Sequence, residues 1–134
     1  MNTAPALVVG LGCQRGCDVD TLLDLFNTTL KAHGIDRQRI SALASIDRKQ
    51  AEPGLLALAK LLNLPLRFFS AEQLMAYTSR LSHKSAAAYA HTGCHGVAES
   101  AALALAEQLG QLPATLLITR QKIARATFAL ACTG

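Results

Sequence analysis

Side chains able to bind a ligand gather in three short segments, each next to a run of apolar residues. The candidate ligand-binding residues are Gly12, Cys13 and Arg15 in the first segment, Asp47, Lys49 and Glu52 in the second, and Thr92, Gly93 and Glu99 in the third. The glycines let the backbone come close to a bound molecule. The charged groups could pair with an ionic ligand or move protons.

Three of these residues are candidates for catalysis. Glu99 or Asp47 could act as a general base, and Lys49 could stabilise developing negative charge. A glutamate in the first turn of a helix is also favourable for the helix dipole. Glu99 therefore has a structural interpretation beside the catalytic one, and both stay open.

The turn from Gly10 to Gly16 resembles a dinucleotide-binding fingerprint, although its third glycine comes one residue late. A helix N-terminus after such a turn favours anions. Asp47 lies farther along the chain than a ribose-binding acid would. The turn is therefore either part of a nucleotide-binding module or a tight connection from a strand to a helix.

Cysteine and histidine spacings argue against a metal centre. His91, Cys94 and His95 lack a convincing fourth ligand, and Cys13 and Cys17 have no third cysteine nearby. No P-loop and no Ser-His-Asp arrangement is visible. We therefore expect no metal site, no cofactor and reduced thiols.

Composition favours one domain over residues 1–134 that binds a small anion. The net charge is only +4, and the basic residues are scattered along the sequence rather than gathered in one run. Aromatic residues make up only 4%, which leaves little for stacking on bases. The sequence has no signal peptide and no apolar run of about 18 residues. We expect a cytoplasmic protein that binds neither nucleic acid nor a membrane.

Hydrophobic patterns predict alternating strands and helices. Strands are expected at residues 6–11, 40–46, 66–69, 114–118 and 126–131. Helices are expected at residues 18–34, at 53–63, after Ser70 and at 97–109, and a long loop at 79–96 with a short strand at 86–90. This order predicts an α/β fold: a single three-layer domain with a mostly parallel sheet of about five strands, helices on both faces and a C-terminal antiparallel strand pair.

Three longer stretches resemble a known family when they are read together. They are residues 8–13 with Arg15, residues 43–49 with Glu52, Gly54 and Leu55, and residues 93–103 with 116–118, Lys122 and 126–129. In this order and spacing the chain is similar to CobE and to the C-terminal domain of CbiG, from cobalamin biosynthesis. The resemblance covers residues 6–131.

The resemblance implies a protein that binds a precorrin or corrinoid intermediate, either as a carrier or as a participant in lactone opening with loss of a two-carbon fragment. A hydrolase that acts alone on the precorrin lactone is an alternative, and the nucleotide-binding module is another. Other enzymes of the pathway are candidate partners. The carboxylates of a corrinoid could pair with basic side chains, and the loop at residues 79–96 could fold over it as a lid. The basic candidates are Arg15, Arg48, Lys49, Lys84 and Lys122.

Overall fold

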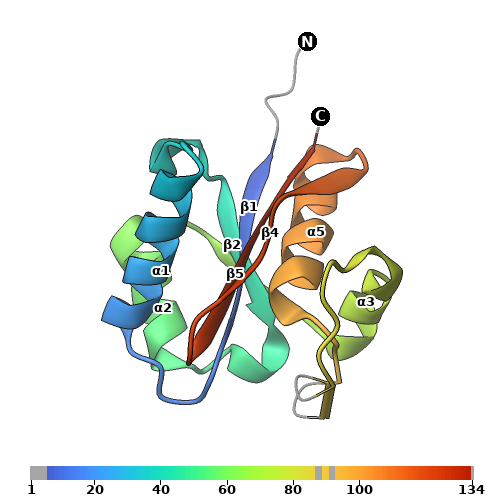
Figure 1. Ribbon diagram of the computed structural model, residues 1–134, viewed down its shortest axis with the longest axis horizontal. Coiled ribbons are helices and arrows are strands. Elements are labelled where there is room, and N and C mark those ends of the chain that lie inside the picture. Colours follow the sequence, from blue (N-terminus) through green and yellow to red (C-terminus); the bar gives the residue numbers. More distant parts are fainter. Residues whose placement is uncertain (1–5, 87–88, 91–92, 134) are drawn as a thin grey trace.

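A computed structural model describes residues 6–86, 89–90 and 93–133, and within them the chain forms one five-stranded sheet. The strand order is β3-β2-β1-β5-β4 (Figure 1). The strands are β1 (Leu7–Cys13), β2 (Ala42–Ile46), β3 (Leu66–Phe69), β4 (Ala114–Lys122) and β5 (Ala126–Thr133). β1, β2 and β3 are parallel, whereas β5 is antiparallel to both β1 and β4.

The sheet is therefore mixed, and the expectation of a mostly parallel sheet was wrong. The predicted antiparallel pair of final strands does form, with β4 at the edge of the sheet and β5 next to β1. A short hairpin requires antiparallel strands, and β5 inserts between β4 and β1. Cys13 at the end of β1 faces Ala126 at the start of β5. The hairpin turn consequently lies at the carboxyl end of β1.

The α-helices whose bounds lie within the described residues and that cover the sheet are α1 (Val19–Ala32), α2 (Pro53–Leu62), α3 (Ala71–Met75) and α5 (Val97–Gly110). α1 and α2 lie on one face, and α3 and α5 lie on the other (Figure 1). Neighbouring residues of β1 point to opposite faces. Val9 packs in the hydrophobic cluster that contains Phe26 of α1, whereas Val8 packs in the cluster that contains Leu103 of α5.

The predicted helix starts are confirmed in atomic detail. The Asp18 side chain accepts a hydrogen bond from the Thr21 N–H at 2.9 Å and caps α1. Pro53 is the first residue of α2. Ser70 and Gln73 form the expected capping box at α3. Asp18 and Ser70 satisfy backbone N–H groups that a helix start leaves unpaired, whereas Pro53 has no N–H that would need a partner.

Two local predictions were wrong. β1 continues along β5 to Cys13, beyond its predicted end at residue 11, so Gly10 and Gly12 both lie in the strand and the predicted Gly10–Gly16 turn begins only after Cys13. The expected strand at residues 86–90 is helical at Ala86, Tyr89 and Ala90, and residues 87 and 88 lie outside the described part. The Tyr89 N–H donates to the Ser85 carbonyl at 3.1 Å, which is the spacing of a helical turn.

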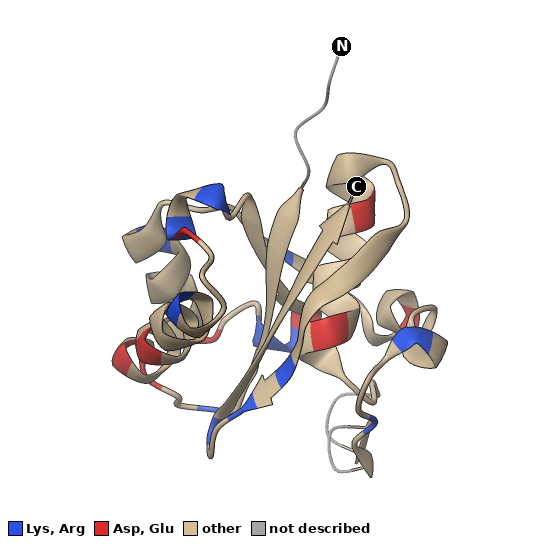
Figure 2. Cartoon of the chain, turned by 45° about the horizontal axis from the view of Figure 1, so that its top comes forward, with Lys and Arg blue, Asp and Glu red and all other residues tan. Residues whose placement is uncertain are grey.

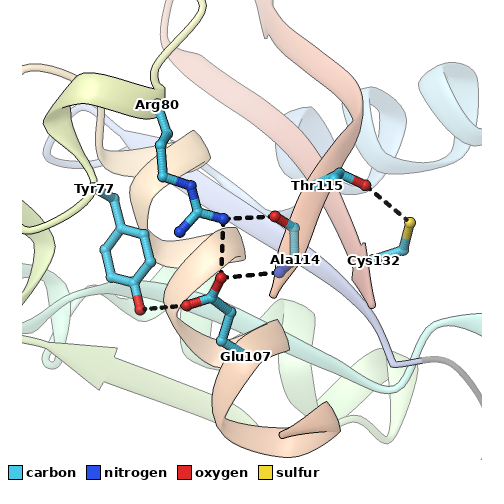
Figure 3. Close-up of polar contacts among 6 residues, drawn as sticks. All are labelled: Tyr77, Arg80, Glu107, Ala114, Thr115 and Cys132. Atoms are coloured by element: carbon cyan, nitrogen blue, oxygen red, sulfur yellow. Dashed lines mark hydrogen bonds and ion pairs between the residues drawn. The ribbon is translucent and has the colours of Figure 1, made fainter. Parts of the chain in front are cut away.

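A polar network fixes the short 3₁₀ turn η3 (Thr78–Arg80) against α5 and β4 (Figure 3). The Glu107 carboxylate accepts hydrogen bonds from the Arg80 guanidinium at 2.9 Å, from the Ala114 N–H at 2.9 Å and from the Tyr77 hydroxyl at 3.2 Å. The Arg80 guanidinium also lies 5.2 Å from the centre of the Tyr77 ring. This network holds the chain that leaves α3 in place.

Among the helices that the structure describes, none is both long and apolar enough to cross a membrane.

Candidate functional site

A cleft of about 620 Å³ lies at the carboxyl end of β1. Its walls come from the end of β1, the first turn of α5, the β4–β5 hairpin and the 3₁₀ turn η2 (Asp47–Lys49) that follows β2. The parallel strands bring the chain segments that follow them to one edge. The hairpin reaches the same edge because β5 begins opposite the last residue of β1.

Six basic side chains line this cleft, and Glu99 is the one acidic residue among the described residues that line it. The basic residues are Arg15, Arg48, Lys49, Arg120, Lys122 and Arg125. Figure 2 shows basic segments gathered around the hairpin and the turn after β2. In the described part of the chain, only Lys49 of these six forms an ion pair, with Glu52 at 3.7 Å. The cleft therefore carries positive charge that the protein itself leaves largely uncompensated.

The first turn of α5 adds backbone donors to the same cleft. Gly96 is the N-cap of this helix, and no side chain caps it. Gly96, Val97 and Ala98 line the cleft. Free N–H groups and the positive end of the helix dipole attract anions. A helix start without its own cap beside six cations can therefore hold carboxylate groups.

Glu99 is 1% exposed and accepts hydrogen bonds from two separate chain segments. Its Oε1 accepts from the N–H groups of Ser82 at 2.9 Å and His83 at 3.4 Å. Its Oε2 accepts from the Ser82 hydroxyl and from the Arg120 N–H at 2.9 Å. This carboxylate joins α5 to the chain before it and to β4.

The structure brings five of the nine predicted site residues to the cleft and leaves others outside it. Gly12, Cys13, Arg15, Lys49 and Glu99 line the cleft. Asp47, Glu52 and Gly93 are not among the described residues that line it, and Thr92 lies outside the described residues.

Glu52 has a structural contact that explains its place beside the cleft. Its Oε2 accepts a hydrogen bond from the Gly16 N–H at 3.0 Å, and only 8% of the residue is exposed. Next to it, Gly54 leaves no space for a side chain, because an added Cβ would lie 2.2 Å from the Cys17 carbonyl oxygen. These contacts bind the start of α2 to the turn after β1.

Arg120 and Arg125 were missed as site residues. The available signal was the hairpin itself, since two antiparallel strands bring the residues around their turn to one end of the sheet. The sequence did not reveal that β5 pairs with β1. Lys122 was among the basic candidates, but without that pairing Arg120 and Arg125 could not be assigned to the edge that carries Arg15 and Lys49.

Gly10 of β1 allows close packing against α5. A Cβ on Gly10 would lie 1.8 Å from the Ala98 carbonyl oxygen, so the missing side chain lets α5 lie directly on the strand. The α1 N-terminus is capped by the carboxylate of Asp18. This geometry does not favour a nucleotide phosphate at α1.

Cys13 and His95 are the candidate reactive side chains of the cleft wall. Burial raises the pKa of the Cys13 thiol to about 11, although the charge of Lys49 opposes this effect. The thiol is therefore protonated at neutral pH and is a weak nucleophile. The His95 ring stacks on Tyr89 with ring centres 4.5 Å apart, and its buried Nδ1 has no hydrogen-bond partner among the described residues.

The structure shows no disulfide among the four cysteines, all of which lie in its described part. Within that part, no group of three or more His, Cys, Asp or Glu side chains is placed to hold a metal ion.

Comparison with known proteins now decides the family. The profile described as "Cobalamin synthesis G C-terminus" matches residues 7–131. The chain belongs to this family. Its members include the proteins whose resemblance the sequence suggested, and that prediction is confirmed. The chain is therefore a cobalamin biosynthesis protein.

Two curated relatives differ in how much of their length this chain spans. The chain is 38% identical to Protein CobE of Sinorhizobium sp over 125 residues, which is 93% of this chain and 79% of the relative. It is 35% identical to the cobalt-precorrin-5A hydrolase of Salmonella typhimurium (strain LT2) over 68 residues, or 51% of this chain. The chain spans only 19% of that hydrolase.

Solved structures agree with this assignment. The crystal structure of CobE, described as a protein from the cobalamin (vitamin B12) biosynthetic pathway, has a TM-score of 0.94 and 45% identity, and the match covers 98% of this chain and 96% of that one. The cobalamin biosynthesis protein chiG from Agrobacterium tumefaciens has a TM-score of 0.73 and 29% identity, with 96% and 99% covered.

Proposed function

We propose that this protein binds a precorrin or corrinoid intermediate of cobalamin biosynthesis in the cleft at the carboxyl end of β1, and that it carries this intermediate between pathway enzymes. The observation that carries the proposal is the set of six basic side chains that line the cleft beside one buried acid. Corrin precursors bear several acetate and propionate carboxylates around a flat macrocycle. Such a ligand carries negative charges at several positions around its ring, which matches the positive charges distributed around the cleft.

Two further features support a carboxylate-rich ligand. The uncapped first turn of α5 offers N–H donors at the floor of the cleft. Four of the six cations are arginines, which can bind a carboxylate through two parallel hydrogen bonds. The cations come from three separate parts of the chain, so they can reach carboxylates at different positions of one large ring.

The test is a binding measurement with two corrinoids that differ in their side chains. Cobyrinic acid carries free carboxylates, whereas cobinamide has amides in their place. We expect the visible absorption of cobyrinic acid to change on binding, with weaker binding as salt rises. Equal affinity for cobinamide would contradict recognition through carboxylates, and no binding of cobyrinic acid would contradict the proposal.

Two double variants that each remove two positive charges test whether the basic residues of the cleft bind the ligand. The double variant Lys122→Ala/Arg125→Ala removes two exposed cations of the cleft, and Arg37→Ala/Lys60→Ala removes two exposed cations away from it. We expect the first to raise the Kd for cobyrinic acid roughly tenfold, since charged hydrogen bonds contribute about 1.5–3 kcal/mol when desolvated and less when exposed. The second should leave the Kd nearly unchanged.

A hydrolytic role is the second candidate, because several relatives are named cobalt-precorrin-5A hydrolases. This chain spans 19% and 25% of two of those relatives. In the cleft, Lys49 could stabilise negative charge on an opening lactone. Incubation with precorrin intermediates, followed by mass spectrometry of bound pigment and released two-carbon product, distinguishes a carrier from a hydrolase.

A further inference from the structure

Glu99 is surrounded by hydrogen-bond donors and offers no free oxygen to a ligand. Three donors come from Ser82 and His83, and the fourth is the Arg120 N–H. Glu99 therefore contributes to the cleft indirectly, by holding the chain at Ser82 and His83 and the strand at Arg120 in position.

The contact to Arg120 lies where β4 departs from regular pairing. The register of β4 with β5 is irregular between Ile118 and Gln121, and Arg120 lies inside this interval. There its N–H donates to the Glu99 carboxylate. Bulges of this kind turn a side chain away from the direction that a regular strand would give it. Arg120 is one of the residues that line the cleft.

We propose that Glu99 is a positioning residue. It fixes the irregular interval of β4 between Ile118 and Gln121, and thereby directs the Arg120 guanidinium to a carboxylate of the ligand. The inference rests on the proposed function, since it takes the ligand to be a carboxylate-rich corrinoid. It replaces the general-base interpretation of Glu99 with an indirect role. The group that touches the ligand is Arg120.

Glu99→Gln is the sharpest perturbation, because it keeps the shape of the side chain. An amide has one acceptor oxygen, so its NH₂ group must face either the Arg120 N–H or the N–H groups of Ser82 and His83. The amide NH₂ group then faces a backbone N–H group in a buried place, and neither of these two donors has an acceptor there. Glu107→Gln is the matched control, because Glu107 lies on the same helix and accepts the Ala114 N–H outside the cleft.

The experiment is a double-mutant cycle on cobyrinic acid binding with Glu99→Gln, Arg120→Ala and the combined variant. Arg120→Ala should raise the Kd roughly 10- to 100-fold. Glu99→Gln should raise it by a similar factor, and the combined variant should bind like Arg120→Ala alone. Glu107→Gln should stay within about twofold of wild type. If Glu99→Gln does not fold, Glu99→Asp takes its place.

The outcomes separate this inference from the proposed function. If the two single losses multiply in the combined variant, Glu99 does not act through Arg120, and the inference is overturned while the proposed function stands. A fall in thermal stability without coupling would also mean a purely structural role. If wild type does not bind cobyrinic acid, the proposed function fails and the inference fails with it.

Discussion

Replacing Gly10 with alanine should destabilise the protein far more than replacing Gly12, two residues further along the same strand. The added Cβ at Gly10 would lie 1.8 Å from the Ala98 carbonyl oxygen and 2.8 Å from the Ala102 nitrogen. Both are backbone atoms of α5, so the helix would have to move by about 1.5 Å to reach ordinary contact. Overpacking of this kind costs about 3 kcal/mol of unfolding free energy or more.

Gly12→Ala places its Cβ 2.7 Å from the Thr127 hydroxyl, which is part of a side chain that can rotate. We expect this variant to lie within about 1 kcal/mol of wild type. Gly34→Ala is a control for backbone conformation alone, because φ at Gly34 is +66° and no atom lies within 4 Å of the added Cβ. It should cost about 1 kcal/mol.

Urea denaturation and thermal unfolding measure these differences. A loss of about 3 kcal/mol should lower the Tm of a chain of this size by roughly 10 °C. If Gly10→Ala unfolds within about 1 kcal/mol of wild type, the contact between α5 and β1 is not as tight as the structure shows. The reasoning that assigns Gly10 to packing would then be refuted.

Three other predictions concern single groups. Burial raises the pKa of Glu107, but hydrogen bonds from Ala114 and Arg80 and the charge of Arg80 outweigh it and lower this pKa below 4.5. The stability that Glu107 contributes is therefore present above pH 4.5 and is lost as the pH falls below it. When the pH is lowered through this range, urea denaturation should show a smaller fall in unfolding free energy for Glu107→Gln than for wild type. With a pKa of about 11 instead of 9.0, Cys13 should resist iodoacetamide at pH 8, and stability should fall more steeply between pH 9 and about 11 in wild type than in Cys13→Ser; rapid alkylation of Cys13 in the folded protein would contradict this. Ser70→Ala removes the α3 cap and should cost about 1 kcal/mol by urea denaturation, whereas an unchanged midpoint would show that the cap is dispensable.

Sequence patterns predicted the elements well wherever the signal was local. Asp18, Pro53 and the Ser70–Gln73 pair mark helix starts through contacts within a few residues, and β3 was predicted at its observed bounds. The pairing of β5 with β1 depends on residues that are far apart in the chain. The pattern of side chains along β5 does not show which strand it pairs with. The sequence consequently predicted a mostly parallel sheet.

The candidate site was predicted in part for the same reason. Gly12 lies near the end of β1, Arg15 and Lys49 follow β1 and β2, and the rule for the carboxyl edge of a sheet brings the three together. Arg120 and Arg125 reach the cleft through the hairpin, which the rule does not cover. Asp47 and Glu52 share the correct segment with Lys49, but the direction of each side chain depends on the turn η2, whose conformation the sequence did not specify.

The position of β5 between β1 and β4 has a consequence for how the chain folds. β1, β2 and β3 can pair while one long edge of β1 is still bare, and that edge is closed only when the β4–β5 hairpin docks on it. Contacts between distant parts of a chain form slowly, and an uncovered strand edge can recruit another molecule. The same docking step completes the cleft. A ligand that binds in the cleft binds only molecules in which the β4–β5 hairpin has docked on β1. We therefore expect the ligand to increase the fraction of molecules with a docked hairpin during refolding and to decrease aggregation.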